Sequence, residues 1–84
     1  MWYVYIVKCE DGSFYTGITT DIRRRFKEHK TGKGGHYTKS HKITKLLYTE
    51  KYTNQKDALR REFQIKGWRK DKKIKLIKFG KPNI

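Results

Sequence analysis

The chain has 84 residues, which is enough for one small domain and too few for two independent cores. Hydrophobic residues make up 35% and charged residues 36%, but 14% are aromatic, which indicates a thin core of large side chains rather than disorder. No apolar run approaches the ~18 residues of a membrane span, and segment 2–7 is too short and too rich in tyrosine for a signal peptide. The single cysteine, Cys9, cannot form an internal disulfide, so we expect a protein of the reducing cytoplasm.

The charge balance predicts a polyanionic partner. Lys and Arg number 22 against 8 Asp and Glu, a formal net charge of +14. We expect this surface to bind nucleic acid rather than an anionic membrane, because no long amphipathic helix carries the charge. A generic solvated basic surface is the ordinary alternative. Charge alone does not separate a binding protein from an enzyme, since cutting also requires a base, a carboxylate and usually a metal ion.

A hairpin is predicted at the start of the chain, with strands at residues 2–9 and 13–18. Aromatic and β-branched side chains on both faces of the first strand favour a central position in the sheet. A two-residue turn would put Tyr5 and Tyr15 on opposite faces, whereas a three-residue loop with Gly12 in the left-handed conformation pairs Val7 with Tyr15. We favour the longer loop. It places on one face Tyr3, Tyr5 and Tyr15, beside Gly17.

The rest of the chain is predicted to add helices and one more strand. Segment 19–21 offers capping oxygens for a helix at 22–30, which the glycines after it end. A basic loop is expected at 33–42 and a third strand at 44–52. Thr53 or Asn54 caps a second helix that ends near residue 66 or 67. The tail from residue 69 fits an exposed strand or a last helix stopped by Gly80, and we favour the helix.

The second helix carries a carboxylate among apolar residues. Helical rotation places Glu62 near the middle of an arc formed by Ala58, Leu59, Phe63, Ile65 and Trp68. A carboxylate there needs a partner, and the ordinary explanation is an ion pair with Lys66 one turn later or exposure at the edge of a small core. Ligation of a cation is the functional alternative.

Arg25 and His29 share one side of the first helix, four residues apart. A buried histidine is more often structural than catalytic, and an arginine in a run of three is more often solvated. A tyrosine among cations has a reason to ionise, however, so Tyr15 near Arg25 could act as a general base for water, and Arg25 could bridge phosphate oxygens.

Taken in order, these residues resemble the GIY-YIG nuclease superfamily. The matching elements are Tyr3-Val4-Tyr5, Tyr15-Thr16-Gly17, Arg25 with His29 after it, and Glu62 in a later helix. The chain is most similar to the small stand-alone bacterial branch, and through it to the nuclease domain of a eukaryotic structure-specific endonuclease subunit. The resemblance covers residues 1–78 as a nuclease domain, with 79–84 as a C-terminal tail.

The resemblance implies an α+β fold, a three-stranded antiparallel sheet flanked by helices in the order β-β-α-β-α-α. It implies a metal-dependent DNA endonuclease, structure-specific and linked to repair or recombination, with a single Mg²⁺ or Mn²⁺ ion. The implied roles are Tyr15 as general base, Tyr5 as its assistant, Arg25 on the phosphate, His29 as proton acceptor or relay, Glu62 as metal ligand and Gly17 as the motif glycine, where a side chain would crowd the phosphate or the backbone.

Some features depart from the family pattern. The first motif is Tyr-Val-Tyr rather than Gly-Ile-Tyr, so Tyr3 is an alternative to Tyr5, which we favour. Many relatives carry an asparagine after the helix with the glutamate, but this chain has no asparagine between that helix and Asn83. Two other functions therefore stay open: a nucleic-acid-binding module of weak activity that needs a protein partner, and a basic accessory protein of a larger complex. Candidate substrate contacts are Tyr3 and, in the basic loop, Lys33, His36, Lys39 and His41.

Overall fold

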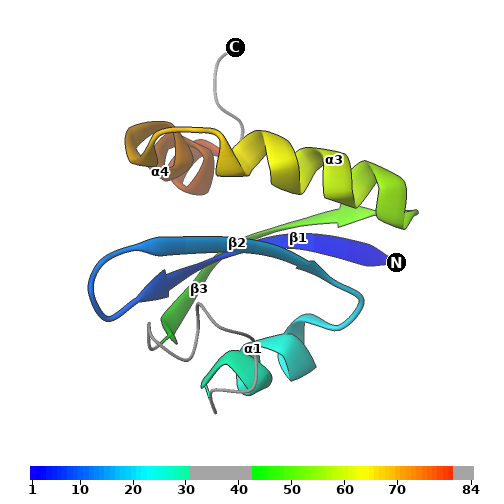
Figure 1. The fold of residues 1–84 in the computed structure, drawn as a ribbon, viewed down its shortest axis with the longest axis horizontal. Helices are drawn as coiled ribbons and strands as arrows, with labels where there is room; N and C mark the ends of the chain where they lie inside the picture. The colour runs from blue at the N-terminus through cyan, green and yellow to red at the C-terminus, as the bar shows by residue number, and fades with distance from the viewer. Residues whose placement is uncertain (31–42, 81–84) are drawn as a thin grey trace.

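The structure is a computed structural model that describes residues 1–30 and 43–80. Its elements are β1 (Trp2–Cys9), β2 (Phe14–Thr19), α1 (Ile22–Lys30), β3 (Ile43–Tyr52), α3 (Gln55–Lys66) and α4 (Lys70–Phe79). The strands form one antiparallel sheet in the order β2-β1-β3. Helix α1 covers one face of this sheet, and α3 with α4 covers the other (Figure 1). The predicted fold class, element order and central position of the first strand are confirmed.

The hairpin between β1 and β2 has the longer of the two loops considered. Gly12 adopts a positive φ of 85°, which L-residues rarely take, and its N–H donates to the carbonyl of Cys9 at 3.0 Å. The N–H of Cys9 in turn donates to the carbonyl of Ser13 at 2.9 Å. Val7 therefore pairs with Tyr15, and the favoured register is confirmed.

Each face of β1 contributes to a separate core. Val4 and Ile6 point toward α3 and α4 and pack with Ala58, Ile65 and Leu76. On the opposite face, Tyr5, Val7, Cys9 and Ile43 form a second buried cluster, closed by Ile22 and Phe26 of α1. The burial of residues 4–7 of β1 on both faces explains the continuous apolar sequence there.

The helix boundaries follow from local capping. The side chain of Asn54 accepts a hydrogen bond from the N–H of Asp57 at 2.9 Å, so Asn54 rather than Thr53 begins α3. Gly80 ends α4 in the left-handed conformation, and its N–H donates to the carbonyl of Leu76. The ambiguous tail is therefore a helix, as favoured. None of the helices in residues 1–30 and 43–80 has the length and apolar character to cross a membrane.

The apolar arc predicted for α3 is wrong in part. Ala58 and Ile65 are fully buried, but Leu59 is 46% exposed and Phe63 is 82% exposed. The physical reason is that only the narrow stripe of residues seven apart faces the sheet, and its flanks reach past the core. Glu62 consequently lies on a flank of the buried stripe rather than in the middle of an apolar surface.

Candidate active site

The face of the sheet covered by α1 contains a buried contact between Tyr5 and His29. Tyr5 is 2% exposed on the central strand, and His29 is 1% exposed on α1. Tyr5 Oη lies 2.7 Å from His29 Nε2, and Arg25 Nε donates a longer hydrogen bond of 3.4 Å to the same oxygen. Because Arg25 and His29 are four residues apart, α1 presents both to one phenol. The structure thus brings together three of the predicted site residues.

The protonation states within this contact follow from burial. Burial outweighs the opposing effect of Arg25 and raises the pKa of Tyr5 to about 12, so the phenol keeps its proton at neutral pH. Burial, together with the charge of Arg25, lowers the pKa of His29, which favours the neutral imidazole. Tyr5 therefore donates to Nε2 of His29, and the imidazole hydrogen resides on Nδ1, which has no hydrogen-bond partner within the described residues.

Gly17 lies opposite Tyr5 in the β1–β2 pairing and makes room for its ring. A Cβ atom at this position would lie 2.5 Å from Tyr5 Oη and 2.7 Å from Cζ, well inside van der Waals contact. The crowding expected around the motif glycine therefore comes from the Tyr5 phenol, rather than from the phosphate or backbone that the resemblance implied. Gly17 holds Tyr5 against the sheet and directs its hydroxyl toward α1.

Tyr15 completes the aromatic cluster from the edge strand β2. Its ring centroid lies 6.3 Å from that of Tyr5 and 5.3 Å from that of His29, the latter with edge-to-face geometry. Tyr15 is half-buried, and its oxygen is close enough to Arg25 to help Tyr5 raise the pKa of the guanidinium. On the other side, Lys66 Nζ of α3 lies 5.9 Å from the Tyr15 ring centroid. Tyr15 therefore stands between two cations.

Glu62 approaches this edge of the sheet from the opposite layer. Its carboxylate lies 3.6 Å from Lys66 Nζ, and the Glu62 side chain is 17% exposed. Its negative charge also contributes to the raised pKa of Tyr5. The ion pair with Lys66 that the sequence suggested is present, but the Lys66 side chain is 50% exposed and free to rotate toward solvent.

A single divalent cation is compatible with Glu62. No cluster of three or more His, Cys, Asp or Glu side chains that could hold a metal occurs in residues 1–30 and 43–80. Mg²⁺ keeps most of its water and binds through one or two carboxylates together with substrate phosphates, so one half-buried carboxylate beside a displaceable lysine fits its requirements. The residues present could therefore hold such an ion by one protein ligand.

The remaining predicted residues lie elsewhere. Tyr3 is on the same sheet face as Tyr5 but lines a pocket at the start of α1, with Thr20, Asp21 and Leu46 among its neighbours. Its position favours Tyr5 over Tyr3 as the first tyrosine of the site. Four further candidates lie outside the described residues: Lys33, His36, Lys39 and His41.

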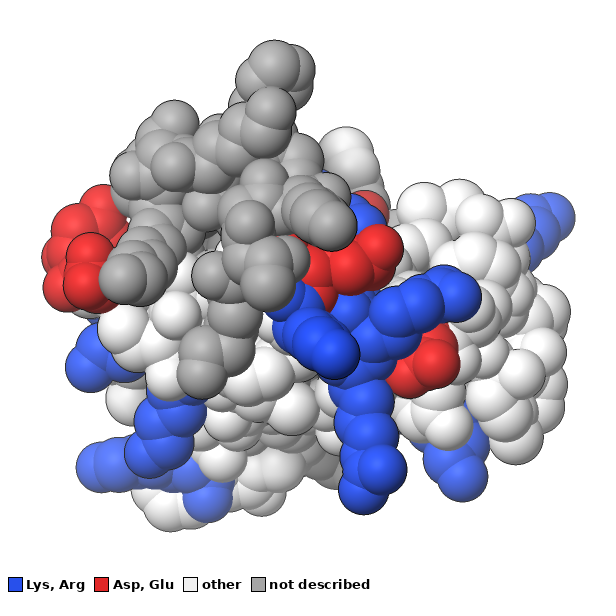
Figure 2. Space-filling view, turned by 90° about the horizontal axis from the view of Figure 1, so that it is seen from below, with Lys and Arg blue, Asp and Glu red and all other residues white. Residues whose placement is uncertain are grey.

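Lys and Arg side chains gather near the middle of the face that carries α1, with a few acidic side chains between them (Figure 2). Helix α1 contributes several of these cations, since Arg23, Arg24 and Lys27 are exposed on it. Positive charge on this face lies over the layer that holds His29 and Arg25. Such a surface attracts a phosphate backbone toward the site.

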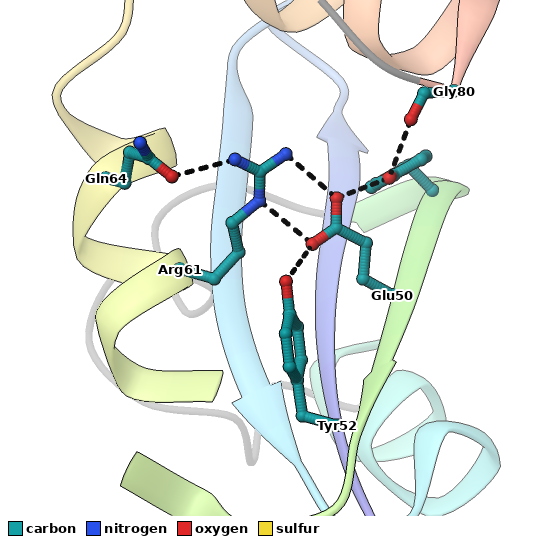
Figure 3. A network of polar contacts seen from close by, with 6 residues as sticks. Glu50, Tyr52, Arg61, Gln64 and Gly80 are labelled. Atoms are coloured by element: carbon teal, nitrogen blue, oxygen red, sulfur yellow. Dashed lines mark hydrogen bonds and ion pairs between the residues drawn. The ribbon is translucent and has the colours of Figure 1, made fainter. Parts of the chain in front are cut away.

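A second polar network fixes the orientation of α3. Arg61 donates two hydrogen bonds to the Glu50 carboxylate, Nε to Oε1 at 2.9 Å and Nη2 to Oε2 at 3.0 Å (Figure 3). Tyr48 and Tyr52 donate to the same carboxylate. Arg61 also donates to Gln64 at 2.7 Å. Both charges are largely buried and paired with each other, which ties α3 to β3 and so sets the position of Glu62 one residue later.

The sequence interpretation missed the structural role of this network and treated Lys66 only as a partner of Glu62. A signal for the network was present, because Tyr48, Glu50 and Tyr52 alternate along one strand and so share a face. The sequence near Lys66 gave no sign that this residue lies close to Tyr15, because that contact depends on how α3 crosses the edge of the sheet.

The comparisons with known proteins identify the family of the chain. Residues 1–75 match the family model described as the GIY-YIG catalytic domain, and the chain belongs to the GIY-YIG family, whose members are nucleases of the phosphodiester-hydrolase type. It is 46% identical over 78 residues to UPF0213 protein SERP0126 of Staphylococcus epidermidis, covering 93% of this chain and 95% of that protein. UPF0213 protein SSP2268 of Staphylococcus saprophyticus shows the same identity and coverage.

A solved structure also matches. The solution NMR structure of UPF0213 protein BH0048 from Bacillus halodurans is 42% identical in sequence and superposes with a TM-score of 0.59, covering 93% of this chain and 84% of that one. These relatives are small stand-alone bacterial proteins of the GIY-YIG family. The resemblance noted from the motif residues is therefore confirmed.

Proposed function

We propose that this protein is a metal-dependent endonuclease that hydrolyses phosphodiester bonds in DNA. The observation that carries the proposal is the cluster of Tyr5, Tyr15, Arg25 and His29 at the β2 edge, approached by Glu62 from the opposite layer. These are a base, a cationic phosphate ligand and a carboxylate, the groups that separate cutting from binding.

In the proposed reaction Tyr15, acting as its phenolate, accepts a proton from the attacking water, whose oxygen bonds to phosphorus while the bond from phosphorus to the leaving oxygen breaks and solvent protonates that oxygen. It stands between Arg25 and Lys66 at the edge of the sheet, next to the guanidinium that would hold the phosphate. Arg25 binds the nonbridging oxygens of the scissile phosphate, where its charge stabilises the transition state. A divalent ion held by Glu62, Mg²⁺ or Mn²⁺, would add positive charge at the phosphate.

In this proposal Tyr5 and His29 pass a proton in one direction, from the Tyr5 hydroxyl to the His29 imidazole. Tyr5 holds its proton at neutral pH and already donates to a neutral His29. If Tyr5 Oη receives a proton from water, its own proton can pass to Nε2 of His29 at the same time, so no phenolate has to form in the buried site. Tyr5 therefore assists and orients the water rather than acting as the main base.

The substrate is proposed from charge and family. A net charge of +14 supports a polyanionic substrate, and the family supports nucleic acid. A role in repair or recombination, action on branched DNA, and association with the bacterial nucleoid in the cytoplasm are part of the same proposal.

Three tyrosine-to-phenylalanine variants test the assignment of roles. Cleavage of single-stranded, duplex, flapped and four-way DNA is measured with Mg²⁺ or Mn²⁺. Tyr15→Phe is expected to lower the rate by about 10²–10⁴-fold, as loss of a general base does, and Tyr5→Phe by a smaller factor. Tyr3→Phe is the matched control and should cleave like wild type. Equal losses in Tyr3→Phe and Tyr15→Phe would contradict the proposed roles.

The second candidate is a nucleic-acid-binding module of little activity by itself, which needs a protein partner. The ion pair between Glu62 and Lys66 favours it, because that carboxylate is already neutralised by a lysine. This candidate predicts binding with a steep salt dependence and no cleavage of any substrate in the panel.

A further inference from the structure

Phe63 stands in solvent beside the candidate active site. Its side chain is 82% exposed, and Leu59 one turn earlier is 46% exposed. Phe63 directly follows Glu62 on α3. Phe63 and Leu59 together leave apolar surface on one side of α3, and an exposed apolar patch bordered by polar residues is typical of an interaction site.

Three cationic residues share the Phe63 side of α3. Helical spacing places these cations on the same side of α3 as Phe63. They are Lys56, seven residues before it, Arg60, three residues before it, and Lys66, three residues after it. All three are exposed. Exposed apolar side chains and cations thus lie together on this side of α3, the combination that recurs where proteins bind single strands.

This side of α3 lies at the β2 edge. Lys66 Nζ is 3.6 Å from the Glu62 carboxylate and 5.9 Å from the Tyr15 ring centroid. Phe63 projects from the same flank of the helix, one residue past Glu62 and further from the sheet. A nucleotide adjoining a phosphate at Tyr15 and Glu62 would therefore meet the Phe63 ring.

We propose that Phe63 is a stacking platform for an unpaired nucleobase next to the scissile phosphate. The inference rests on the proposed nuclease function and specifies its substrate class, DNA with a single-stranded segment at the cleavage point. Stacking on an aromatic ring contributes about 1–3 kcal/mol per base and does not depend on which base is present. A continuous duplex cannot use the platform, because the faces of its bases are already covered by their neighbours.

Binding in EDTA tests the proposal without requiring cleavage. The probes are a short oligothymidylate that carries one fluorescent aminopurine base, and a duplex of equal length. Phe63→Ala should weaken binding of the single strand by about 5- to 100-fold and relieve the quenching of the aminopurine, with little change for the duplex or for the salt slope. Phe63→Trp should bind the single strand at least as well as wild type.

Phe79→Ala is the matched control. Phe79 is 75% exposed at the end of α4, and the next residue, Gly80, accepts a hydrogen bond from Tyr48 of β3 at 3.2 Å, so Phe79 lies at the edge opposite β2. The proposal would be overturned if Phe63→Ala and Phe79→Ala weakened single-strand binding equally. It would also be overturned if neither variant weakened it. So would a change in sedimentation of Phe63→Ala without a change in binding, which would assign the ring to contacts between copies of the chain. If wild type stacks the aminopurine as predicted but cuts no DNA in Mg²⁺ or Mn²⁺, the result would count against the nuclease function alone.

Discussion

The hydroxyl oxygen of Tyr5, on β1, makes hydrogen bonds with two residues of α1. It accepts a hydrogen bond from Arg25 and donates one to His29, while its ring packs over the backbone of Gly17. The hydroxyl cannot keep both contacts if the ring moves, because the ring lies between the β2 backbone at Gly17 and helix α1. The space at Gly17 is therefore as important to the site as the tyrosine itself.

Gly17→Ala should consequently displace Tyr5. The added Cβ would lie 2.5 Å from Tyr5 Oη, so either the strands separate or the phenol leaves His29. We expect a loss of about 1–3 kcal/mol in the free energy of unfolding, typical of overpacking, together with a lower cleavage rate. Denaturant unfolding measures the first and the DNA cleavage assay the second.

Gly67→Ala is the control for this change. A Cβ at Gly67 would meet its nearest backbone oxygen at 3.5 Å, an ordinary contact, and φ there is −78°. Its unfolding free energy should stay within about 1 kcal/mol of wild type. If Gly17→Ala proves as stable and as active as Gly67→Ala, the close approach of Tyr5 to Gly17 is not a constraint on the site.

At the scale of elements, α3 is positioned by its contact with β3. Burial alone would raise the pKa of Glu50, but hydrogen bonds from Arg61, Tyr48 and Tyr52 outweigh it and hold that pKa below its usual value of 4.5. A carboxyl whose pKa is lower in the folded state stabilises the fold above its unfolded pKa. This stabilisation is lost as the pH falls from 4.5 through the folded value.

Arg61→Ala should break this contact and leave Glu50 with hydroxyl partners alone. We expect about 2–4 kcal/mol of destabilisation at neutral pH, because the remaining charge is largely buried. The variant should also lose less stability than wild type on acidification below pH 4.5. Unfolding curves across that pH range measure both effects. Arg60→Ala, an exposed neighbour, should change stability by no more than about 0.5 kcal/mol, and equal effects of the two variants would contradict the role of Arg61.

The order of elements was predictable because each boundary has a local cause. Gly12 determined the hairpin loop, Asn54 the start of α3 and Gly80 the end of α4. The tail stayed ambiguous in sequence because Ile74-Lys75-Leu76-Ile77 fits either period, and the burial of Leu76 against α3 and the sheet resolves it.

The site was predictable where helix and strand periods align residues. Arg25 and His29 share a side of α1 by spacing, and Tyr5 shares a face with Tyr15 by register. The exposure of Phe63 was not predictable in this way, since the width of the buried stripe on α3 depends on how much of the helix the three-stranded sheet covers. The spacing of apolar residues alone could not show where the core stops.

At the scale of the whole molecule, two layers meet at one edge of the sheet. Helix α1 delivers Arg25 and His29 from one face, and α3 delivers Glu62 and Lys66 from the other, with Tyr15 of the edge strand between them. The edge position leaves the site open to a long polymer, and the net charge of +14 attracts one.

Glu62 gives the most direct test of whether these groups cut DNA. Wild type is compared with Glu62→Gln on flapped and four-way DNA in Mg²⁺ or Mn²⁺, with Glu10→Gln, an exposed acid in the hairpin turn, as the control. We predict that Glu62→Gln lowers cleavage by at least about a hundredfold while DNA affinity stays within about twofold, because the carboxylate acts on the reaction rather than on binding. Cleavage by Glu62→Gln at the rate of wild type, or binding without cleavage by wild type on every substrate, would contradict the account.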